Sequence, residues 1–190
     1  MKVIGVVGLN GSGKDEVLKY LNQKYNVPFI SVGDLVREIA SREGLALTRE
    51  NLDAISRKYF DKFGEGYFLK LVIERIRQNQ WQICGISGVR SLQDVSNIRE
   101  AFKSDFVLIE VFISDPKVRF ARIAARGSQR DQLSYEQFLR QDEASQELFK
   151  IRDTLKLADV AIPNNGTLAE LHDRIERVVR DKQLLQGIHL

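Results

Sequence analysis

The stretch Gly8-Leu9-Asn10-Gly11-Ser12-Gly13-Lys14-Asp15 follows the phosphate-binding P-loop pattern at every position except the last. The pattern is G-x-x-x-x-G-K followed by serine or threonine, whose hydroxyl meets a magnesium ion. Its glycines let consecutive backbone N–H groups converge on a phosphate, and its lysine reaches the outer phosphates of a nucleoside triphosphate. Residues 8–15 are therefore predicted to bind ATP and Mg²⁺, with Asp15 as the candidate metal ligand.

The residues on both sides of this loop support that interpretation. The run Lys2-Val-Ile-Gly-Val-Val-Gly8 is rich in β-branched residues, as expected of a parallel strand buried on both faces. After the loop, Val17, Leu18 and Leu21 have the spacing of one helix face. An ordinary glycine turn is the alternative, but strand, loop and helix in this order are the setting that the motif requires.

The rest of the chain alternates between strand and helix patterns. Apolar runs predict four more strands, at residues 28–32, 82–87, 105–113 and 158–163. Residues 34–80 have helical spacing, broken near Gly44 and at residues 64–66, and Thr48 is a suitable N-cap between them. Capping signals predict further helices after Asp115, Ser134 and Thr167. We expect a single α/β domain over residues 1–190, with three α/β/α layers and a five-stranded parallel sheet.

Composition limits the setting and the partners. The 190 residues carry a net charge of +3 without a run of five like charges, so a small anion satisfies this bias and nucleic-acid binding is not expected. The single cysteine, Cys84, lies in an apolar run, which excludes an internal disulfide and fits a reducing cytosol. No stretch is long and apolar enough to span a membrane, and the first strand leaves no room for a signal peptide. A cytoplasmic protein is predicted, and its oligomeric state stays open.

Together these motifs resemble the P-loop nucleoside and nucleotide kinases, especially the relatives of adenylate kinase and dephospho-CoA kinase. The segment Gly33-Asp34-Leu35-Val36-Arg37 is similar to the G-D-L-x-R segment of that family, whose arginine grips the phosphate of the acceptor. The resemblance implies that Arg37 and Asp34 contact the acceptor, with Asp34 as the base. It also implies that residues 34–80 form the helical insert that holds this small molecule.

A second segment of the resemblance concerns arginines. Arg122-Ile-Ala-Ala-Arg126 is similar to the stretch that enters the lid of adenylate kinase, where one arginine stacks on adenine and another contacts phosphate. This implies catalytic roles for Arg122 and Arg126, with Arg122 also at the nucleotide, and a short lid over residues 127–133 in which Arg130 contacts substrate. Asn165 and Gly166 resemble the turn around the adenine. Arg119, Arg122 and Arg126 share one helix face, for which a solvated basic surface is the alternative.

The end of the third strand departs from the family pattern. Related sequences often have Asp-Gly-x-Arg there, whereas this chain has Ser87-Gly88-Val89-Arg90, so the acid is missing and the arginine remains as a predicted acceptor contact. One hypothesis is compensation, in which Asp15 supplies the carboxylate that Ser87 lacks and both lie near the same metal. The alternative is that Asp15 only complements the helix dipole.

The predicted activity is ATP-dependent phosphoryl transfer to a small acceptor. Asp34, Arg37 and Arg90 favour a phosphorylated acceptor, of the nucleoside monophosphate or dephospho-CoA class. A nucleotide-binding regulator or pseudo-kinase without transfer is the alternative, supported by Ser87, and a GTP switch is disfavoured because no N-K-x-D motif occurs. The apolar tail at residues 183–190 docks either on the domain or on a partner.

Overall fold

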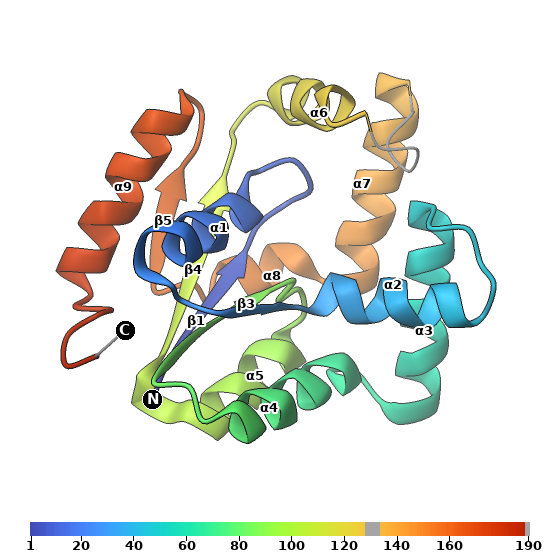
Figure 1. Ribbon diagram of the computed structural model, residues 1–190. Helices are drawn as coiled ribbons and strands as arrows, with labels where there is room; N and C mark the ends of the chain where they lie inside the picture. Colours follow the sequence, from blue (N-terminus) through green and yellow to red (C-terminus); the bar gives the residue numbers. More distant parts are fainter. Residues whose placement is uncertain (128–133, 189–190) are drawn as a thin grey trace.

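Five parallel strands form the centre of the protein (Figure 1). The computed structural model describes residues 1–127 and 134–188. The strands are β1 (Lys2–Val7), β2 (Phe29–Ser31), β3 (Ile83–Ser87), β4 (Phe106–Phe112) and β5 (Val160–Pro163), and they lie in the order β2-β3-β1-β4-β5. β1 is central, so Gly5 lies opposite Ile86 on one side and Leu108 on the other. The predicted five-stranded parallel sheet is confirmed.

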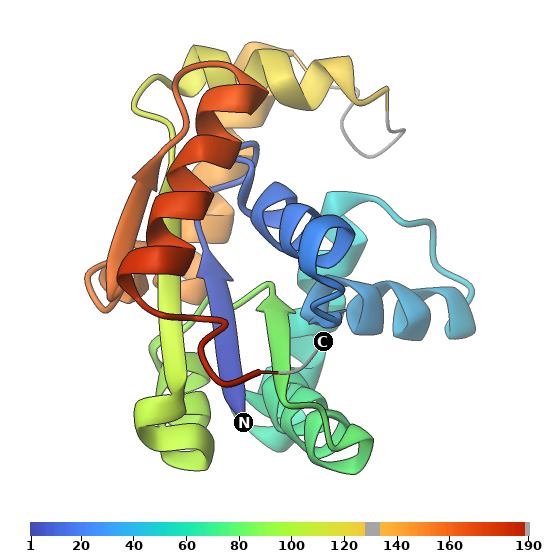
Figure 2. The same cartoon turned by 60° about the vertical axis from the view of Figure 1, so that its left-hand side comes forward.

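Helices cover both faces of this sheet, as Figures 1 and 2 show from two sides. Alternate residues of β1 point to opposite faces, with Val3 and Val7 in one apolar cluster and Ile4 and Val6 in the other. The first cluster is completed mainly by α4 (Tyr67–Asn79) and α5 (Leu92–Phe102). The second is completed by α1 (Lys14–Tyr25) and α9 (Leu168–Asp181). The predicted three α/β/α layers are therefore present.

Three helices occupy the segment between β2 and β3. α2 (Val32–Arg42) and α3 (Arg49–Phe63) precede α4, and their apolar sides meet in a third cluster of Val36, Ala40, Ile55 and Phe68. Thr48 caps α3 as predicted, because its hydroxyl accepts the N–H of Asn51 at 3.2 Å. Gly64 and Gly66, with φ of 88° and 82°, allow the sharp change of direction from α3 to α4.

Of the residues that the structure describes between β4 and β5, most belong to three further helices. α6 (Pro116–Ala125) begins at the predicted Asp115 cap, and α7 (Tyr135–Phe149) begins at the predicted Ser134 capping box. Lys150, with φ of 50°, turns the chain from α7 into the short α8 (Ile151–Leu155). Most of the predicted lid, residues 128–133 with Arg130, falls outside the described residues.

Three elements were not predicted, namely α5, the turn η1 (Lys103–Asp105) after it, and α8. α5 begins with a capping box of Ser91 and Asp94, a form with aspartate in place of the usual glutamate or glutamine. The apolar tail docks on its own domain, because Leu184 is 1% exposed and packs with Leu185 and Ile188 in the α1 and α9 cluster. Within the described part of the chain, no helix is long and apolar enough to cross a membrane.

We expect the layer under α5 to contribute strongly to stability. Ile98 is fully buried in the first cluster, so Ile98→Ala should lower the free energy of unfolding by about 2–5 kcal/mol. Leu92→Ala, in the same helix at a side chain that is 41% exposed, should change it by less than about 1 kcal/mol. Urea unfolding followed by circular dichroism measures both, and equal losses would contradict the assigned burial.

Candidate functional site

The P-loop connects β1 to α1 at the carboxyl edge of the sheet. The N–H of Ser12 donates to the carbonyl of Leu9 at 3.1 Å, which closes the turn of the loop. Gly11 and Gly13 have φ of 82° and 90°, a region that favours glycine. A Cβ atom on Gly13 would also lie 2.3 Å from Nδ2 of Asn164. The sequence pattern of the loop is therefore matched by its backbone conformation and its packing.

A cavity extends from this loop toward α2 and α3, and its lining is rich in charged groups. Its cationic side chains are Lys14, Arg37, Arg49, Arg90 and Arg126, and its carboxylates are Asp15, Asp53 and Asp94. Apolar side chains, among them Val36, Leu52, Phe60, Phe68 and Phe149, form another part of its lining, which we call the aromatic wall. The excess of positive charge beside an apolar wall suits an anionic ligand with an apolar part.

Arg90 is held in place by the turn that follows β3. The backbone N–H groups of Arg90 and Ser91 each donate to Oδ2 of Asp94 at 3.0 Å, and Gly88 has φ of 90° in the same turn. The guanidinium of Arg90 lies 4.8 Å from the ring centre of Phe149. Burial and the nearby charge of Arg49 lower the pKa of Arg90, while Asp53 and Asp15 oppose that shift. An anion entering the cavity would offset the repulsion between the arginines.

Asp15 and Ser87 are in direct contact, since the Ser87 hydroxyl donates to Oδ1 of Asp15. The two residues are therefore adjacent, and the metal that they are predicted to share stays a prediction. Burial opposes the ionisation of Asp15, but the charge of Lys14 and the Ser87 hydrogen bond outweigh it and lower the pKa of that carboxyl. Burial also lowers the pKa of Lys14, against the raising effect of Asp15. The carboxylate is thus ionised beside the P-loop lysine.

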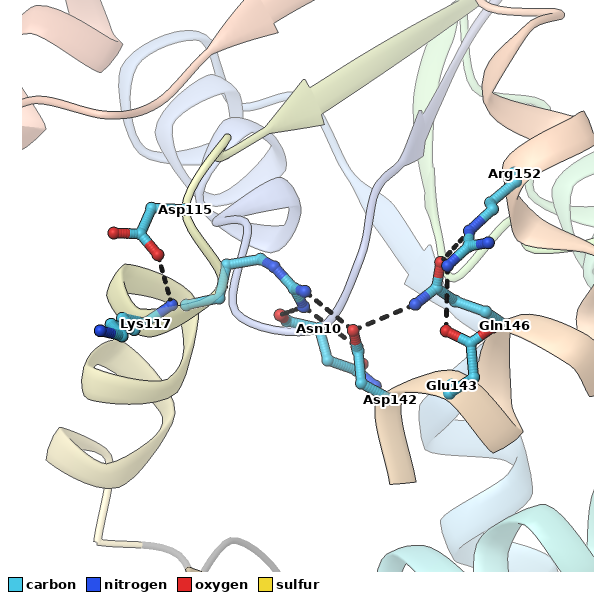
Figure 3. A network of polar contacts seen from close by, with 8 residues as sticks. Asn10, Asp115, Lys117, Asp142, Glu143, Gln146 and Arg152 are labelled. Atoms are coloured by element: carbon cyan, nitrogen blue, oxygen red, sulfur yellow. Dashed lines mark hydrogen bonds and ion pairs between the residues drawn. The ribbon is translucent and has the colours of Figure 1, made fainter. Parts of the chain in front are cut away.

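Three arginines in or directly after α6 have different surroundings, although their spacing puts them on one face. Arg119 is 4% exposed and binds both oxygens of Asp142, at 3.0 and 2.8 Å. Figure 3 shows this network, which continues from Asp142 to Gln146. Arg122 donates to the carbonyl of Gly166 at 3.0 Å, and Arg126 lines the cavity. A solvated basic face therefore does not describe Arg119, and its buried pairing was not predicted.

The predicted acceptor residues Asp34 and Arg37 form an ion pair at the start of α2. Arg37 lines the cavity. The side chain of Asp34 is 69% exposed, and among the described residues it does not line the cavity. Asn165 accepts the N–H of Ser114 at 3.1 Å, beside Gly166 in the turn after β5. The roles of Asp34, Asn165 and Gly166 remain predictions.

Sequence reasoning missed several cavity residues on α3. Arg49, Asp53, Ser56 and Phe60 recur at intervals of four, three and four residues, so they share one face of the helix, and all line the cavity. The hydroxyl of Ser145 in α7 donates to Oδ2 of Asp53 at 3.1 Å. The spacing was available in the sequence, but nothing in it indicated which face of α3 would meet the P-loop.

Comparisons with known proteins agree with this arrangement. A family model described as an AAA domain matches residues 7–139. A UPF0200 protein of Pyrococcus horikoshii is 39% identical over 93% of this chain and 95% of its own length, and one of Thermococcus onnurineus is 34% identical over 93% and 96%. The chain belongs to the UPF0200 proteins and carries an AAA domain.

Solved structures show the same fold at low sequence identity. A shikimate kinase from Acinetobacter baumannii has a TM-score of 0.56 at 18% identity, covering 98% of this chain and 96% of its own. A gluconokinase from Sinorhizobium meliloti has a TM-score of 0.59 at 17% identity and covers 98% of both chains. These neighbours show that this UPF0200 protein shares the fold of those kinases, as the sequence predicted.

We expect the Asp94 carboxylate to stabilise the turn that carries Arg90. Asp94→Ala leaves the N–H groups of Arg90 and Ser91 without their acceptor and should lower the free energy of unfolding by about 1–2 kcal/mol. Asp94→Asn keeps one oxygen acceptor and should lose less. Urea unfolding of both variants measures the difference, and an unchanged Asp94→Ala protein would contradict the assigned role.

Proposed function

We propose that this protein is an ATP-dependent kinase that transfers a phosphoryl group to a small, phosphorylated acceptor. The observation that carries the proposal is the shared cavity, in which Lys14 and Asp15 of the P-loop face the same space as Arg37 and Arg90. Triphosphate held by the loop and an anion held by these arginines would meet in that space. The structural neighbours named shikimate kinase and gluconokinase support transfer to a small molecule.

The charge of the cavity supports a phosphorylated acceptor, of the nucleoside monophosphate or dephospho-CoA class. Arginine binds phosphate through two parallel N–H bonds, and two arginines can neutralise one monophosphate. Arg90 is already oriented by its backbone bonds to Asp94 and by the ring of Phe149. The aromatic wall beside it offers a surface for the planar or apolar part of the acceptor.

The transfer itself exchanges one phosphorus–oxygen bond for another. An acceptor oxygen forms a bond to the γ-phosphorus, the bond to the β–γ bridging oxygen breaks, and ADP leaves with that electron pair. An ionised phosphate oxygen needs no base for this step. An acceptor hydroxyl must lose a proton, and the cavity carboxylate Asp53 is a candidate to take it, alongside the predicted Asp34. Lys14 and Arg126 would offset the charge of the transferred group, the main catalytic requirement of this chemistry.

The donor set beside the P-loop fits a magnesium ion. Asp15 and Ser87 supply a carboxylate and a hydroxyl, the hard oxygen ligands that Mg²⁺ prefers, and this ion usually takes only one or two protein ligands. When bound there, Mg²⁺ would neutralise charge on the triphosphate. Among the described residues, no group of three or more His, Cys, Asp or Glu is placed to hold a metal alone.

Acceptor recognition can be tested through Arg90. A screen of nucleoside monophosphates and dephospho-CoA with MgATP should find an acceptor that is consumed as ADP forms. Arg90→Lys removes the planar fork and should raise KM for that acceptor about 10–100-fold, with a small effect on KM for ATP. The control is Arg42→Lys in the exposed pair with Glu38, which should leave both constants unchanged.

The screen also tests the rival function. One observation favours a regulator that binds nucleotide without transferring phosphate. Ser87 stands where the kinases that this chain resembles often have an aspartate. Tight ATP binding with no ADP formed from any acceptor would support the regulator and reject the kinase.

The metal role of Asp15 is tested by its amide. Asp15→Asn removes the negative charge while keeping the size, so the enhancement of ATP affinity by Mg²⁺ should fall about tenfold. Glu16→Gln is the matched control, because Glu16 is the next residue of α1 and pairs with Lys19 at 4.0 Å. Isothermal titration of ATP with and without Mg²⁺ measures the effect. Equal enhancement in Asp15→Asn and the wild type would reject the role.

A further inference from the structure

Two carbonyl groups of the P-loop are bound by buried side chains from distant parts of the chain. The carbonyl of Asn10 accepts a hydrogen bond from Nη1 of Arg119 at 3.0 Å. The carbonyl of Ser12 accepts one from Nδ2 of Asn164 at 2.9 Å. Arg119 and Asn164 are only 4% and 3% exposed, so both donor residues are buried.

These bonds determine the direction of the neighbouring amides. No cis peptide bond occurs in the described part of the chain, so each P-loop peptide group is trans, and its N–H points opposite to its C=O. When Arg119 holds the carbonyl of Asn10, the N–H of Gly11 points away from α6. When Asn164 holds the carbonyl of Ser12, the N–H of Gly13 points away from the β5 turn.

Those two amides are available for a ligand. Within the described residues, neither the N–H of Gly11 nor the N–H of Gly13 donates a hydrogen bond to the protein. The loop also packs closely against its neighbours at both glycines. A Cβ atom on Gly11 would lie 2.7 Å from the carbonyl oxygen of Arg119, and one on Gly13 would lie 2.3 Å from Asn164 Nδ2.

Both side chains are themselves held by neighbouring groups. Arg119 joins two residues that Figure 3 labels, because it donates to the carbonyl of Asn10 and to Asp142. Asp142 also accepts from Nε2 of Gln146 at 3.1 Å, and the Arg119 guanidinium lies 5.3 Å from the ring centre of Phe138. The backbone N–H of Asn164 donates to Phe112 at 2.8 Å, which continues the ladder between β4 and β5.

We propose that Arg119 and Asn164 are positioning residues that aim the Gly11 and Gly13 amides at the phosphates of the nucleotide. Asp142 acts one step further back, because it fixes the guanidinium of Arg119. The inference rests on the proposed nucleotide binding but not on phosphoryl transfer. Arg119 thus binds the backbone of the loop itself, whereas Arg122 and Arg126 are predicted to contact the adenine and the phosphate.

The binding test uses MgADP and three variants. Arg119→Lys keeps the charge beside Asp142 but cannot hold two carboxylate oxygens and the carbonyl together. The double variant Arg119→Met/Asp142→Leu removes both charges, so that neither is left buried alone, a replacement that often preserves folding. Asn164→Leu removes the donor to Ser12 at similar size. Each variant should weaken MgADP binding about tenfold, measured by isothermal titration.

The matched control is Arg99→Lys. Arg99 of α5 also donates to a backbone carbonyl, that of Leu157 at 2.8 Å. Neither residue belongs to the P-loop or to the elements directly before and after it. This variant should bind MgADP within twofold of the wild type. If Arg99→Lys weakened MgADP binding as much as Arg119→Lys does, the loss of affinity would not depend on the P-loop carbonyl, and the proposal would be overturned.

A second measurement separates positioning from a structural role and does not need a nucleotide. In the nucleotide-free protein, ¹⁵N relaxation should show more motion at the Gly11 amide when Arg119 is changed and at the Gly13 amide when Asn164 is changed. A folded double variant with wild-type MgADP affinity and a rigid Gly11 amide would reject the inference. Wild-type protein that binds no MgADP would reject the proposed function and, with it, the phosphate as the target of these amides. The relaxation data would then show only whether Arg119 and Asn164 hold the two amides in place.

Discussion

The phosphate-binding loop can turn its N–H groups inward only if its carbonyl groups are satisfied on the outside. A buried carbonyl without a partner costs about 1–3 kcal/mol, so the loop needs donors on its outer side. Here the donors come from Arg119 in α6 and Asn164 after β5, which are far from the loop in sequence. The C-terminal half of the chain is therefore required to complete a site whose motif lies in the first fifteen residues.

The buried pair of Arg119 and Asp142 is the electrostatic consequence of this requirement. Removing two opposite charges from water is costly, and excellent geometry with additional hydrogen bonds is needed to offset that cost. Asp142 binds the guanidinium through both oxygens and accepts a further bond from Gln146. On the same buried side of α7, Ser145 binds Asp53 in the cavity wall, and Phe149 lies beside Arg90. α7 thus supplies contacts both to Arg119, which binds the P-loop, and to residues that line the cavity.

The parts of the fold that were predicted depend on local pattern. The strand, P-loop and first helix, the Thr48 and Ser134 caps and the parallel sheet all follow from neighbouring residues. Local pattern does not determine which helix face meets a distant element, so the cavity roles of Arg49 and Asp53 and the pairing of Arg119 were missed. α5 was missed because its capping box ends in aspartate instead of glutamate or glutamine.

The relation between Asp15 and Ser87 follows from the strand order. β3 lies next to β1, and Ser87 at the end of β3 is paired in register with Val6, just before the P-loop. A side chain at the end of β3 and one at the start of α1 therefore reach the same point, as their hydrogen bond shows. A carboxylate supplied by either element places its charge beside Lys14. The negative charge beside Lys14 is consequently in the same place whether the acid lies at the start of α1, as Asp15 does, or at the end of β3.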